Sequence, residues 1–349
     1  MKIIRMRPSG KELAVEEGES ILGTLERNGF ALPNNCRAGA CGECKCKVLS
    51  GDFDQGLVMD MALSEEDRAE GWALTCMAKQ TSDVLEIDFG TEDAKPKLFP
   101  PRENVYCVVV DKFPRTPSII ELRLRPLGQP LRFWPGQYVT LGDRSAGIPE
   151  RCYSIANIPN RENEIVLQVT RVKGGQTSNW IHDTLAEGDN VVINGPYGTF
   201  IGDPSADTPV LCLASGSGLA PIISLASAAF LRGGFRHPAT ILFSARTRDD
   251  VYETGLFAYL KARFRMFNFR YTLTREPNPG GLEGRLPAQL PSLFPDLSGY
   301  SVYIAGSPGF VDDCAAAALA LGLPPERLHQ EGFVSQVRPE TPPRERLVG

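Results

Sequence analysis

The sequence predicts a multidomain protein that combines an α+β unit, a small antiparallel β-barrel and an α/β unit with a parallel sheet. Three observations in the 349 residues lead to this fold class. Three cysteines crowd one loop near the amino end, among short alternating strands and a single helix. Residues 105–200 carry short strands separated by Pro and Gly, a pattern typical of a barrel. From Thr208 onward strands and helices alternate, which indicates a parallel sheet.

In the amino-terminal unit, apolar alternation predicts a hairpin over residues 3–15 and a last strand over residues 84–88. Ser20 is placed to cap a helix with Ile21, Leu22 and Leu25 on one face, and glycine at position 29 ends it. A strand over residues 44–49 and a short acidic helix near residues 64–70 complete a unit of about ninety residues, within the usual range for a domain.

The cysteine spacing indicates an iron–sulfur site. Cys36, Cys41 and Cys44 are separated by four and then two residues, and Cys76 follows at a distance. In plant-type 2Fe–2S centres one loop supplies three thiolates and a distant segment the fourth. Small residues between the cysteines allow backbone N–H groups to point at sulfur. Cys46 is the spare, and we expect it to be a packed thiol in a strand.

Zinc and disulfides are the alternatives for these cysteines. Zinc favours two Cys-x2-Cys pairs, and the sequence has one. Disulfides fit poorly with nine cysteines and no sign of a secretory signal. The spacing therefore favours the 2Fe–2S cluster.

The second unit carries one motif that would suit a flavin nucleotide and one that would suit a phosphate group. Arg151, Cys152, Tyr153 and Ser154 lie on an expected strand, where a cation, a ring and a hydroxyl suit a diphosphate, a flavin ring and a ring heteroatom. A structural Arg–Tyr pair is the alternative for this motif alone. A glycine-rich run opens the expected helix and is typical of a phosphate site at a helix N-terminus. That run is Gly174, Gly175, Gln176, Thr177 and Ser178.

We expect the strands of this second unit at residues 105–110, 119–124, 138–141, 153–155, 165–169 and 191–193, and its helix near residues 179–185. The third unit is expected to have strands at residues 210–214, 240–243, 269–273, 302–305 and 328–333. Its expected helices cover residues 219–231 and 310–321.

Between the first strand and first helix of the third unit lies a glycine loop that spans Gly216, Gly218, Leu219 and Pro221. Glycine at this place lets backbone N–H groups approach a pyrophosphate. The loop lacks the third glycine of the dinucleotide fingerprint, so its position carries the argument. A second strand–glycine–helix arrangement contains Gly306.

Charge is uneven along the chain. The net charge is −5, and residues 1–95 hold 18 acidic and 11 basic side chains, which leaves +2 for the remainder. An acidic unit speeds encounter with a basic acceptor, or serves solubility alone. A pI near 5.5 without a basic stripe argues against nucleic-acid binding. The uncharged run at residues 210–231 is interrupted by glycine and proline, so we expect no membrane span and a cytoplasmic protein.

In this order the motifs resemble the NADH-dependent reductase components of bacterial multicomponent oxygenases, in which a plant-type ferredoxin is fused to a module similar to ferredoxin–NADP reductase. The resemblance covers about residues 1–333. It implies a β-grasp 2Fe–2S ferredoxin domain (1–91), a linker (92–102), an FAD-binding antiparallel β-barrel (103–203), a parallel-sheet NAD(P)-binding domain (204–333) and a tail (334–349).

The resemblance also implies site residues. Ser154 and Glu331 are the expected catalytic pair, with Phe333 beside the flavin. The expected cluster ligands are Cys36, Cys41, Cys44 and Cys76. The expected cofactor-binding residues are Arg151, Cys152, Tyr153, Ser154, Gly174, Gly175, Gln176, Thr177, Ser178, Gly216, Gly218, Leu219, Pro221, Arg246, Gly306 and Phe333.

The activity that the resemblance implies is hydride transfer from NAD(P)H to FAD, followed by single electrons passing through the cluster to a partner oxygenase docked at the acidic ferredoxin domain. NADH is the expected donor, although Arg246, Arg248 and Arg275 follow strand ends where a 2′-phosphate would lie. One departure is that the family's Cys-Gly-Pro-Pro loop begins with Ala305 here. A reductase for a deoxysugar dehydrase and a flavin and iron–sulfur redox sensor are the alternatives.

Overall fold

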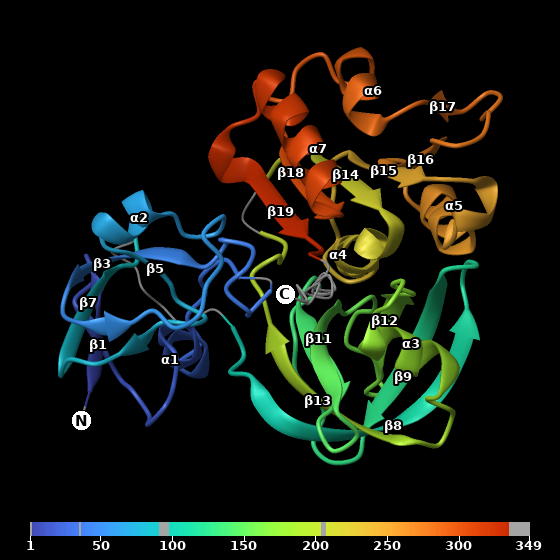
Figure 1. The fold of residues 1–349 in the computed structure, drawn as a ribbon. Helices are drawn as coiled ribbons and strands as arrows, with labels where there is room; N and C mark the ends of the chain where they lie inside the picture. The colour runs from blue at the N-terminus through green and yellow to red at the C-terminus, as the bar shows by residue number, and fades with distance from the viewer. Residues whose placement is uncertain (1, 35, 91–97, 204–206, 335–349) are drawn as a thin grey trace, which may run out of the picture.

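The computed structural model describes residues 2–34, 36–90, 98–203 and 207–334. The chain forms three units that follow one another along the sequence (Figure 1). Most of the expected linker over residues 92–102, and all but the first residue of the expected tail over residues 334–349, lie outside the described residues. In the described part of the chain, no helix is long and apolar enough to cross a membrane.

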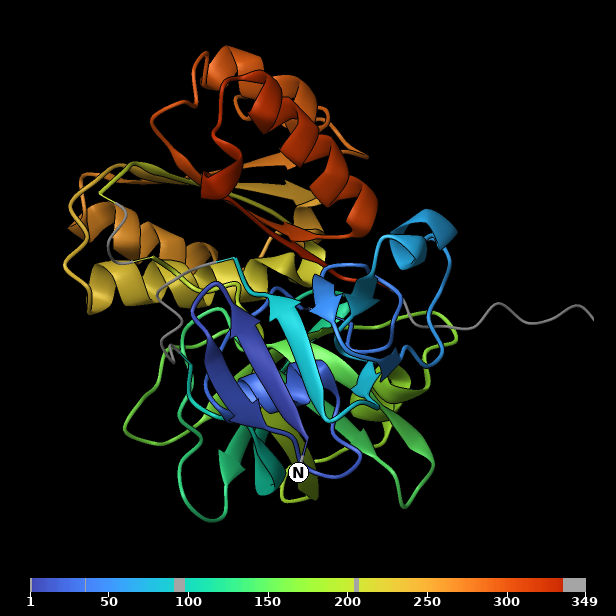
Figure 2. The same cartoon turned by 90° about the vertical axis from the view of Figure 1, so that its left-hand side faces the viewer.

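The amino-terminal unit is a mixed five-stranded sheet in the order β2-β1-β7-β3-β5, with helix α1 (Ile21–Arg27) packed on it. Strands β1 (Ile3–Arg7) and β7 (Val84–Asp88) pair in parallel. The Ser20 side chain accepts a hydrogen bond from the N–H of Gly23, so the expected N-cap is present. Figure 2 shows this unit in front of the other two. Its remaining elements are β2 (Lys11–Ala14), β3 (Lys45–Ser50), β4 (Phe53–Asp54), α2 (Glu65–Ala69), β5 (Trp72–Leu74) and β6 (Lys79–Gln80).

The second unit is a curled antiparallel sheet in the order β11-β10-β13-β8-β9-β12. A bridge between Ile155 and Leu167 joins its two edges, so the sheet closes as the expected barrel. Helix α3 (Gln176–Asp183) begins three residues earlier than the sequence indicates. The strands are β8 (Arg102–Pro114), β9 (Ile119–Pro126), β10 (Tyr138–Asp143), β11 (Ile148–Ser154), β12 (Ile165–Thr170) and β13 (Asn190–Tyr197).

The third unit is a six-stranded parallel sheet in the order β17-β16-β15-β14-β18-β19. Helices α4 and α5 share one hydrophobic cluster with the sheet, and α6 and α7 share the cluster of the opposite face. The strand order reverses between β14 and β18, which is where ligands bind in open α/β sheets. The elements are β14 (Val210–Ser215), η1 (Gly216–Gly218), α4 (Leu219–Leu231), β15 (Ala239–Ala245), η2 (Arg248–Asp250), α5 (Thr254–Arg263), β16 (Phe267–Leu273), β17 (Leu282–Glu283), α6 (Leu286–Leu293), β18 (Ser301–Gly306), α7 (Pro308–Ala320), η3 (Pro325–Arg327) and β19 (Leu328–Gly332).

Two helices of this unit are not evident from the sequence. Helix α5 follows Glu253, whose backbone is left-handed (φ 59°) and whose side chain makes no capping hydrogen bond. Helix α6 contains Pro287 near its start and Pro291 inside it, and proline is a poor helix former. Tertiary burial of residues such as Leu286 and Leu290 overrides the weak local preference.

Candidate functional site

The four cysteines of the expected cluster site form two pairs of thiols. Cys36, Cys41 and Cys44 lie on the loop before β3, and Cys76 follows β5. The Cys36 and Cys41 side chains are hydrogen-bonded to each other, as are those of Cys44 and Cys76. In the described part of the chain, no three His, Cys, Asp or Glu side chains are gathered so as to hold one metal ion. Two thiol pairs fit a binuclear centre with four cysteine ligands.

Backbone N–H groups surround the Cys36 sulfur, as expected from the small residues of the loop. The amides of Ala38, Ala40 and Cys41 lie 3.5, 3.3 and 3.3 Å from its Sγ atom. The Cys41 thiol and these amides lower the pKa of Cys36 to about 5. Gly39 has a φ of +68°, and a Cβ there would lie 3.0 Å from the carbonyl oxygen of Leu57. A low-pKa thiol inside a tight loop fits a metal thiolate.

Cys46 differs from these four thiols. It is 3% exposed in β3, and its thiol donates to the carbonyl oxygen of Asp88 at 3.3 Å. Burial raises the pKa of this thiol to about 12. Cys46 is therefore a packed core residue, as the sequence predicts.

A cavity of about 810 Å³ lies between the barrel and the parallel sheet, and one of the cluster-loop cysteines, Cys36, reaches its wall. This volume falls within the usual range for cofactor sites. Nearly all of the expected flavin residues line it. These are Arg151, Cys152, Tyr153, Ser154, Gly174, Gly175, Gln176, Thr177, Ser178, Glu331 and Phe333, joined by Gly216 from the third unit.

The start of α3 fits a phosphate group. Its N-cap is Gly175, which has no side chain with which to cap the first turn. A Cβ at this position would lie 2.8 Å from Ser178 Oγ and 3.0 Å from Val172 Cβ, so glycine is required. The uncapped N–H groups of a helix start bind anions, and Arg151 lies on the wall of the same cavity.

Ser154 and Glu331 meet in this cavity although 177 residues separate them. The Ser154 hydroxyl donates to Glu331 Oε2 at 3.3 Å, and the two residues are 8% and 3% exposed. Burial, together with the nearby charge of Glu43, raises the pKa of Glu331 to about 8. The carboxyl group is therefore mostly protonated at neutral pH.

Several expected nucleotide residues lie behind the cavity wall. Leu219 and Pro221 are buried in α4, and neither lines the cavity. A Cβ on Gly218 would lie 2.2 Å from the Ala305 carbonyl oxygen, and one on Gly306 would lie 2.3 Å from Ser215 Oγ. These two glycines are thus needed for the close approach of the loops after β14 and β18. Arg246 is exposed and bonds to Ser118 and Asp250.

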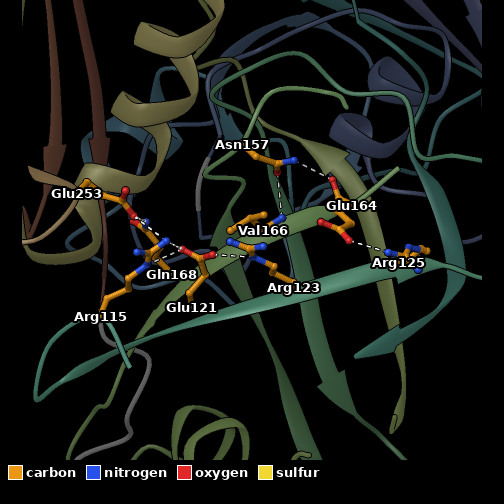
Figure 3. A network of polar contacts seen from close by, with 9 residues as sticks. All are labelled: Arg115, Glu121, Arg123, Arg125, Asn157, Glu164, Val166, Gln168 and Glu253. Carbon is orange, nitrogen blue, oxygen red and sulfur yellow. Dashed lines mark hydrogen bonds and ion pairs between the residues drawn. The ribbon is translucent and has the colours of Figure 1, made fainter. Parts of the chain in front are cut away.

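A polar network joins the barrel to the third unit at this point (Figure 3). Glu121 is 2% exposed and accepts two hydrogen bonds. Arg115 Nε donates to its Oε2 at 2.7 Å, and Arg123 Nε donates to its Oε1 at 2.9 Å. Arg115 also lies 3.4 Å from Glu253 Oε1, to which the Gln168 side-chain amide donates at 3.1 Å. The network therefore runs from strand β9 of the barrel to the start of α5.

Tyr252 extends this network to the glycine loop. Its hydroxyl lies 3.0 Å from Gln168 Oε1 and 3.1 Å from the Gly216 carbonyl oxygen. The Thr170 hydroxyl donates to Ser217 Oγ at 2.8 Å, which ties the same loop to β12. The sequence analysis did not identify Gln168 or Tyr252. For Gln168 the available signal was its place within the apolar run of an expected strand.

A second cleft, of about 1030 Å³, also borders the cluster loop. Cys41, Met59 and Met61 line it from the first unit, and Val311 and Asp312 of α7 line it from the third. Cys36 lines the first cavity and Cys41 the second, and Arg151 and Val334 line both, so the cluster loop contributes to two adjoining hollows.

Comparison with known proteins places each unit in a described family. Residues 4–81 match the 2Fe-2S iron-sulfur cluster binding domain, residues 112–201 the oxidoreductase FAD-binding domain, and residues 212–316 the oxidoreductase NAD-binding domain. These matches and the donor sets described above agree on the three groups that the chain binds: a 2Fe–2S cluster, FAD and a nicotinamide nucleotide.

Relatives extend over nearly the whole chain. The reductase subunit of an aromatic O-demethylase from Amycolatopsis sp. is 34% identical, over 93% of this chain and 96% of the relative. The reductase component of phenol 2-monooxygenase from Pseudomonas sp. is 34% identical over 88% of each chain. The crystal structure of the Amycolatopsis cytochrome P450 reductase GcoB aligns with a TM-score of 0.86 and 32% identity, over 96% of this chain and 99% of that one.

Proposed function

Because this chain belongs to the family of oxygenase reductase components that join a 2Fe–2S ferredoxin domain to FAD-binding and NAD-binding domains, we propose that it carries electrons from NAD(P)H to a terminal oxygenase. One observation carries the proposal. A single cavity unites the Arg151–Ser154 motif, the start of α3, the Gly216 loop and the cluster-loop residue Cys36. When bound, FAD accepts the two electrons of a hydride and the cluster accepts electrons one at a time.

Different residues of the cavity are proposed to bind different parts of the two nucleotides. We assign Arg151 and the start of α3 to the flavin diphosphate, and the Gly216 loop to the nicotinamide nucleotide. The Tyr153 ring, which is partly buried against the core of the barrel, supports the flavin ring. Ser154 and the protonated Glu331 present hydrogen-bonding groups from buried positions on the cavity wall. No acid–base residue is required, because the protein orients and tunes its cofactors.

The proposal also covers the domain boundaries, the cluster ligands and the cellular compartment. We assign residues 1–91 to the ferredoxin domain, 103–203 to the FAD domain and 204–333 to the NAD(P) domain, with a linker over 92–102 and a tail over 334–349. Cys36, Cys41, Cys44 and Cys76 are the proposed cluster ligands, which the two thiol pairs support. We propose the cytoplasm as the compartment, since NAD(P)H is made there and thiols stay reduced.

We propose that the acceptor docks on the ferredoxin domain beside the cluster loop. Leu57, Met59 and Met61 are 88%, 56% and 88% exposed, and such a concentration of exposed apolar side chains marks an interaction site. Exposed acidic residues, namely Asp54, Asp60, Glu65 and Glu66, lie close to them in the sequence. The matching partner surface is apolar at its centre and basic at its rim.

We propose NADH as the preferred donor. Arg246, the expected contact for a 2′-phosphate, already bonds to Asp250 at 3.1 Å and to Ser118 at 3.2 Å. Comparing kcat/KM for NADH and NADPH tests this assignment, and a kcat/KM more than tenfold higher for NADPH would reverse it.

The relatives named above each serve an oxygenase or demethylase system, and this favours such a system over a deoxysugar dehydrase as the electron acceptor.

The decisive experiment compares Cys76→Ser with Cys46→Ala in protein loaded with flavin and iron. Cys76→Ser should abolish reduction of cytochrome c by NADH and leave reduction of ferricyanide, which the flavin alone supports. Cys46→Ala removes a buried thiol outside the proposed ligand set, so it should retain both activities and the iron content. If Cys76→Ser retains cytochrome c reduction, the serial path through the cluster is wrong.

A further inference from the structure

The ferredoxin domain meets the FAD domain through the residue that directly follows Cys36. The Arg37 backbone is left-handed, with a φ of 50°, a conformation that is uncommon for residues other than glycine. Its Nη1 lies 2.8 Å from both carboxylate oxygens of Glu26, whose side chain is 4% exposed. Arg37 is therefore oriented from within its own domain before it reaches the neighbouring one.

The far side of the Arg37 guanidinium lies on an aromatic ring of the FAD domain. Its central carbon is 4.0 Å from the centroid of the Tyr197 ring, at the end of β13. A stacked, partly desolvated guanidinium interacts favourably with the face of tyrosine. Because the carboxylate of Glu26 fixes one edge of the guanidinium, the plane available to Tyr197 is fixed as well.

A second contact lies beside the first. The Tyr138 hydroxyl donates to Asn34 Oδ1 at 2.6 Å, and Tyr138 is 1% exposed. The Tyr138 and Tyr197 rings lie 5.8 Å apart at 45°. A Cβ on Gly198 would lie 2.8 Å from the Tyr138 ring, so glycine makes room for it. Both contacts flank Cys36, since Asn34 precedes it and Arg37 follows it.

We propose that the Arg37–Tyr197 stack positions the cluster loop against the flavin cavity, and so sets the rate at which electrons pass from the FAD domain to the ferredoxin domain. The proposal rests on the proposed function, because it concerns the step between the two proposed cofactor sites. The supporting geometry is that Cys36, held between Asn34 and Arg37, lines the same cavity as Ser154 and Tyr153. Electron transfer falls steeply with distance, so a small retreat of this loop slows the step.

A purely structural role for Arg37 is the competing interpretation. The pair with Glu26 lies within the ferredoxin domain and would stabilise that domain alone. Substituting Arg37 cannot separate the two roles, because its loss also leaves the buried Glu26 carboxylate unpaired. Tyr197 separates them, since it lies in the other domain and does not line the flavin cavity.

The test compares Tyr197→Leu with Tyr197→Phe in the holoprotein. We expect Tyr197→Leu to lower kcat for NADH-dependent cytochrome c reduction at least tenfold and to leave ferricyanide reduction within twofold. Tyr197→Phe keeps the ring and should retain both activities within twofold. Stopped-flow mixing with NADH should show unchanged flavin bleaching and slowed cluster bleaching in Tyr197→Leu alone.

Hydrogen–deuterium exchange supplies a readout independent of turnover. The amides of Ala38, Ala40 and Cys41 should exchange faster in Tyr197→Leu than in Tyr197→Phe, because the loop loses its support. The proposal is overturned if Tyr197→Leu reduces cytochrome c within twofold of the wild type, or if these amides keep their protection. In that event a wild-type enzyme that still needs Cys76 leaves the proposed function standing, so the two failures are distinguishable.

Discussion

Glu331→Gln tests whether a neutral side chain is needed beside Ser154. The Glu331 carboxyl is 3% exposed, and burial raises its pKa to about 8 from the ordinary value for glutamate, near 4.3. Because the folded pKa is raised, the proton is retained on folding and is lost as the pH rises through about 8. With that pKa the group is roughly 90% protonated at pH 7 and roughly 10% protonated at pH 9.

The expected consequence is a fall in activity at alkaline pH. A hydride brings negative charge into the cavity, and a buried, ionised Glu331 would oppose that charge. We therefore expect kcat for NADH–ferricyanide turnover to fall about tenfold between pH 7 and pH 9, in proportion to the protonated fraction. Glutamine keeps a hydrogen-bond donor and cannot ionise, so the variant should lose this pH dependence.

The assay is steady-state turnover at saturating NADH from pH 6 to pH 9.5, with flavin content verified by absorbance at each pH. Glu331→Gln should give a flat profile across pH 7–9, with kcat near the wild-type plateau. A wild-type profile that is flat over this range would refute the raised pKa. A variant that keeps the wild-type fall would show that another group titrates.

Three further predictions follow from packing and exposure. Gly136→Ala should prevent folding or lower Tm by about 6–12 °C, the effect of a destabilisation of roughly 3 kcal/mol. The reason is that the new Cβ would lie 1.9 Å from the Phe200 carbonyl oxygen. Gly147→Ala is the matched control for thermal unfolding, because a Cβ at Gly147 would have nothing within 4 Å. Tyr252→Phe should raise KM for NADH about tenfold with little change in kcat, since it removes a hydrogen bond to the nucleotide loop worth about 1.4 kcal/mol; an unchanged KM would contradict this role. The double substitution Leu57→Ser and Met61→Ser should leave Tm unchanged and raise KM for cytochrome c several-fold, and equal KM values would exclude this surface from docking.

The extent to which the sequence predicts this structure depends on how local each feature is. The cysteine loop and the Arg151–Ser154 strand are short motifs, and the order of the three units follows from changes in hydrophobic period. The barrel and the parallel sheet could be predicted from these changes in hydrophobic period as well. Helix α5 was not, because its first turn lacks a side-chain cap and Phe257 and Leu260 are its only buried side chains.

Contacts between units were beyond sequence reasoning. Asn34 and Tyr138 are 104 residues apart, and Ser154 and Glu331 are 177 apart. The resemblance to a family suggested that Glu331 lies by the flavin, whereas no pattern indicated that Arg37 would stack on Tyr197. Glycines were predicted to approach a nucleotide, which stays a prediction; the structure adds that two of them, Gly218 and Gly306, have no room for a Cβ where the loops after β14 and β18 meet.

The position of the cysteine loop gives the proposed electron path a direction. Cys36 and Cys41 form one thiol pair, yet Cys36 lines the flavin cavity and Cys41 lines the cleft that also contains Met59 and Met61. With the proposed ligand set, the ligand that lines the flavin cavity and the ligand that lines the cleft with the two methionines therefore belong to the same pair. An acceptor that inserts into that cleft also meets α7 at Val311 and Asp312. The proposed docking site would therefore extend from the ferredoxin domain to helix α7 of the NAD(P) domain.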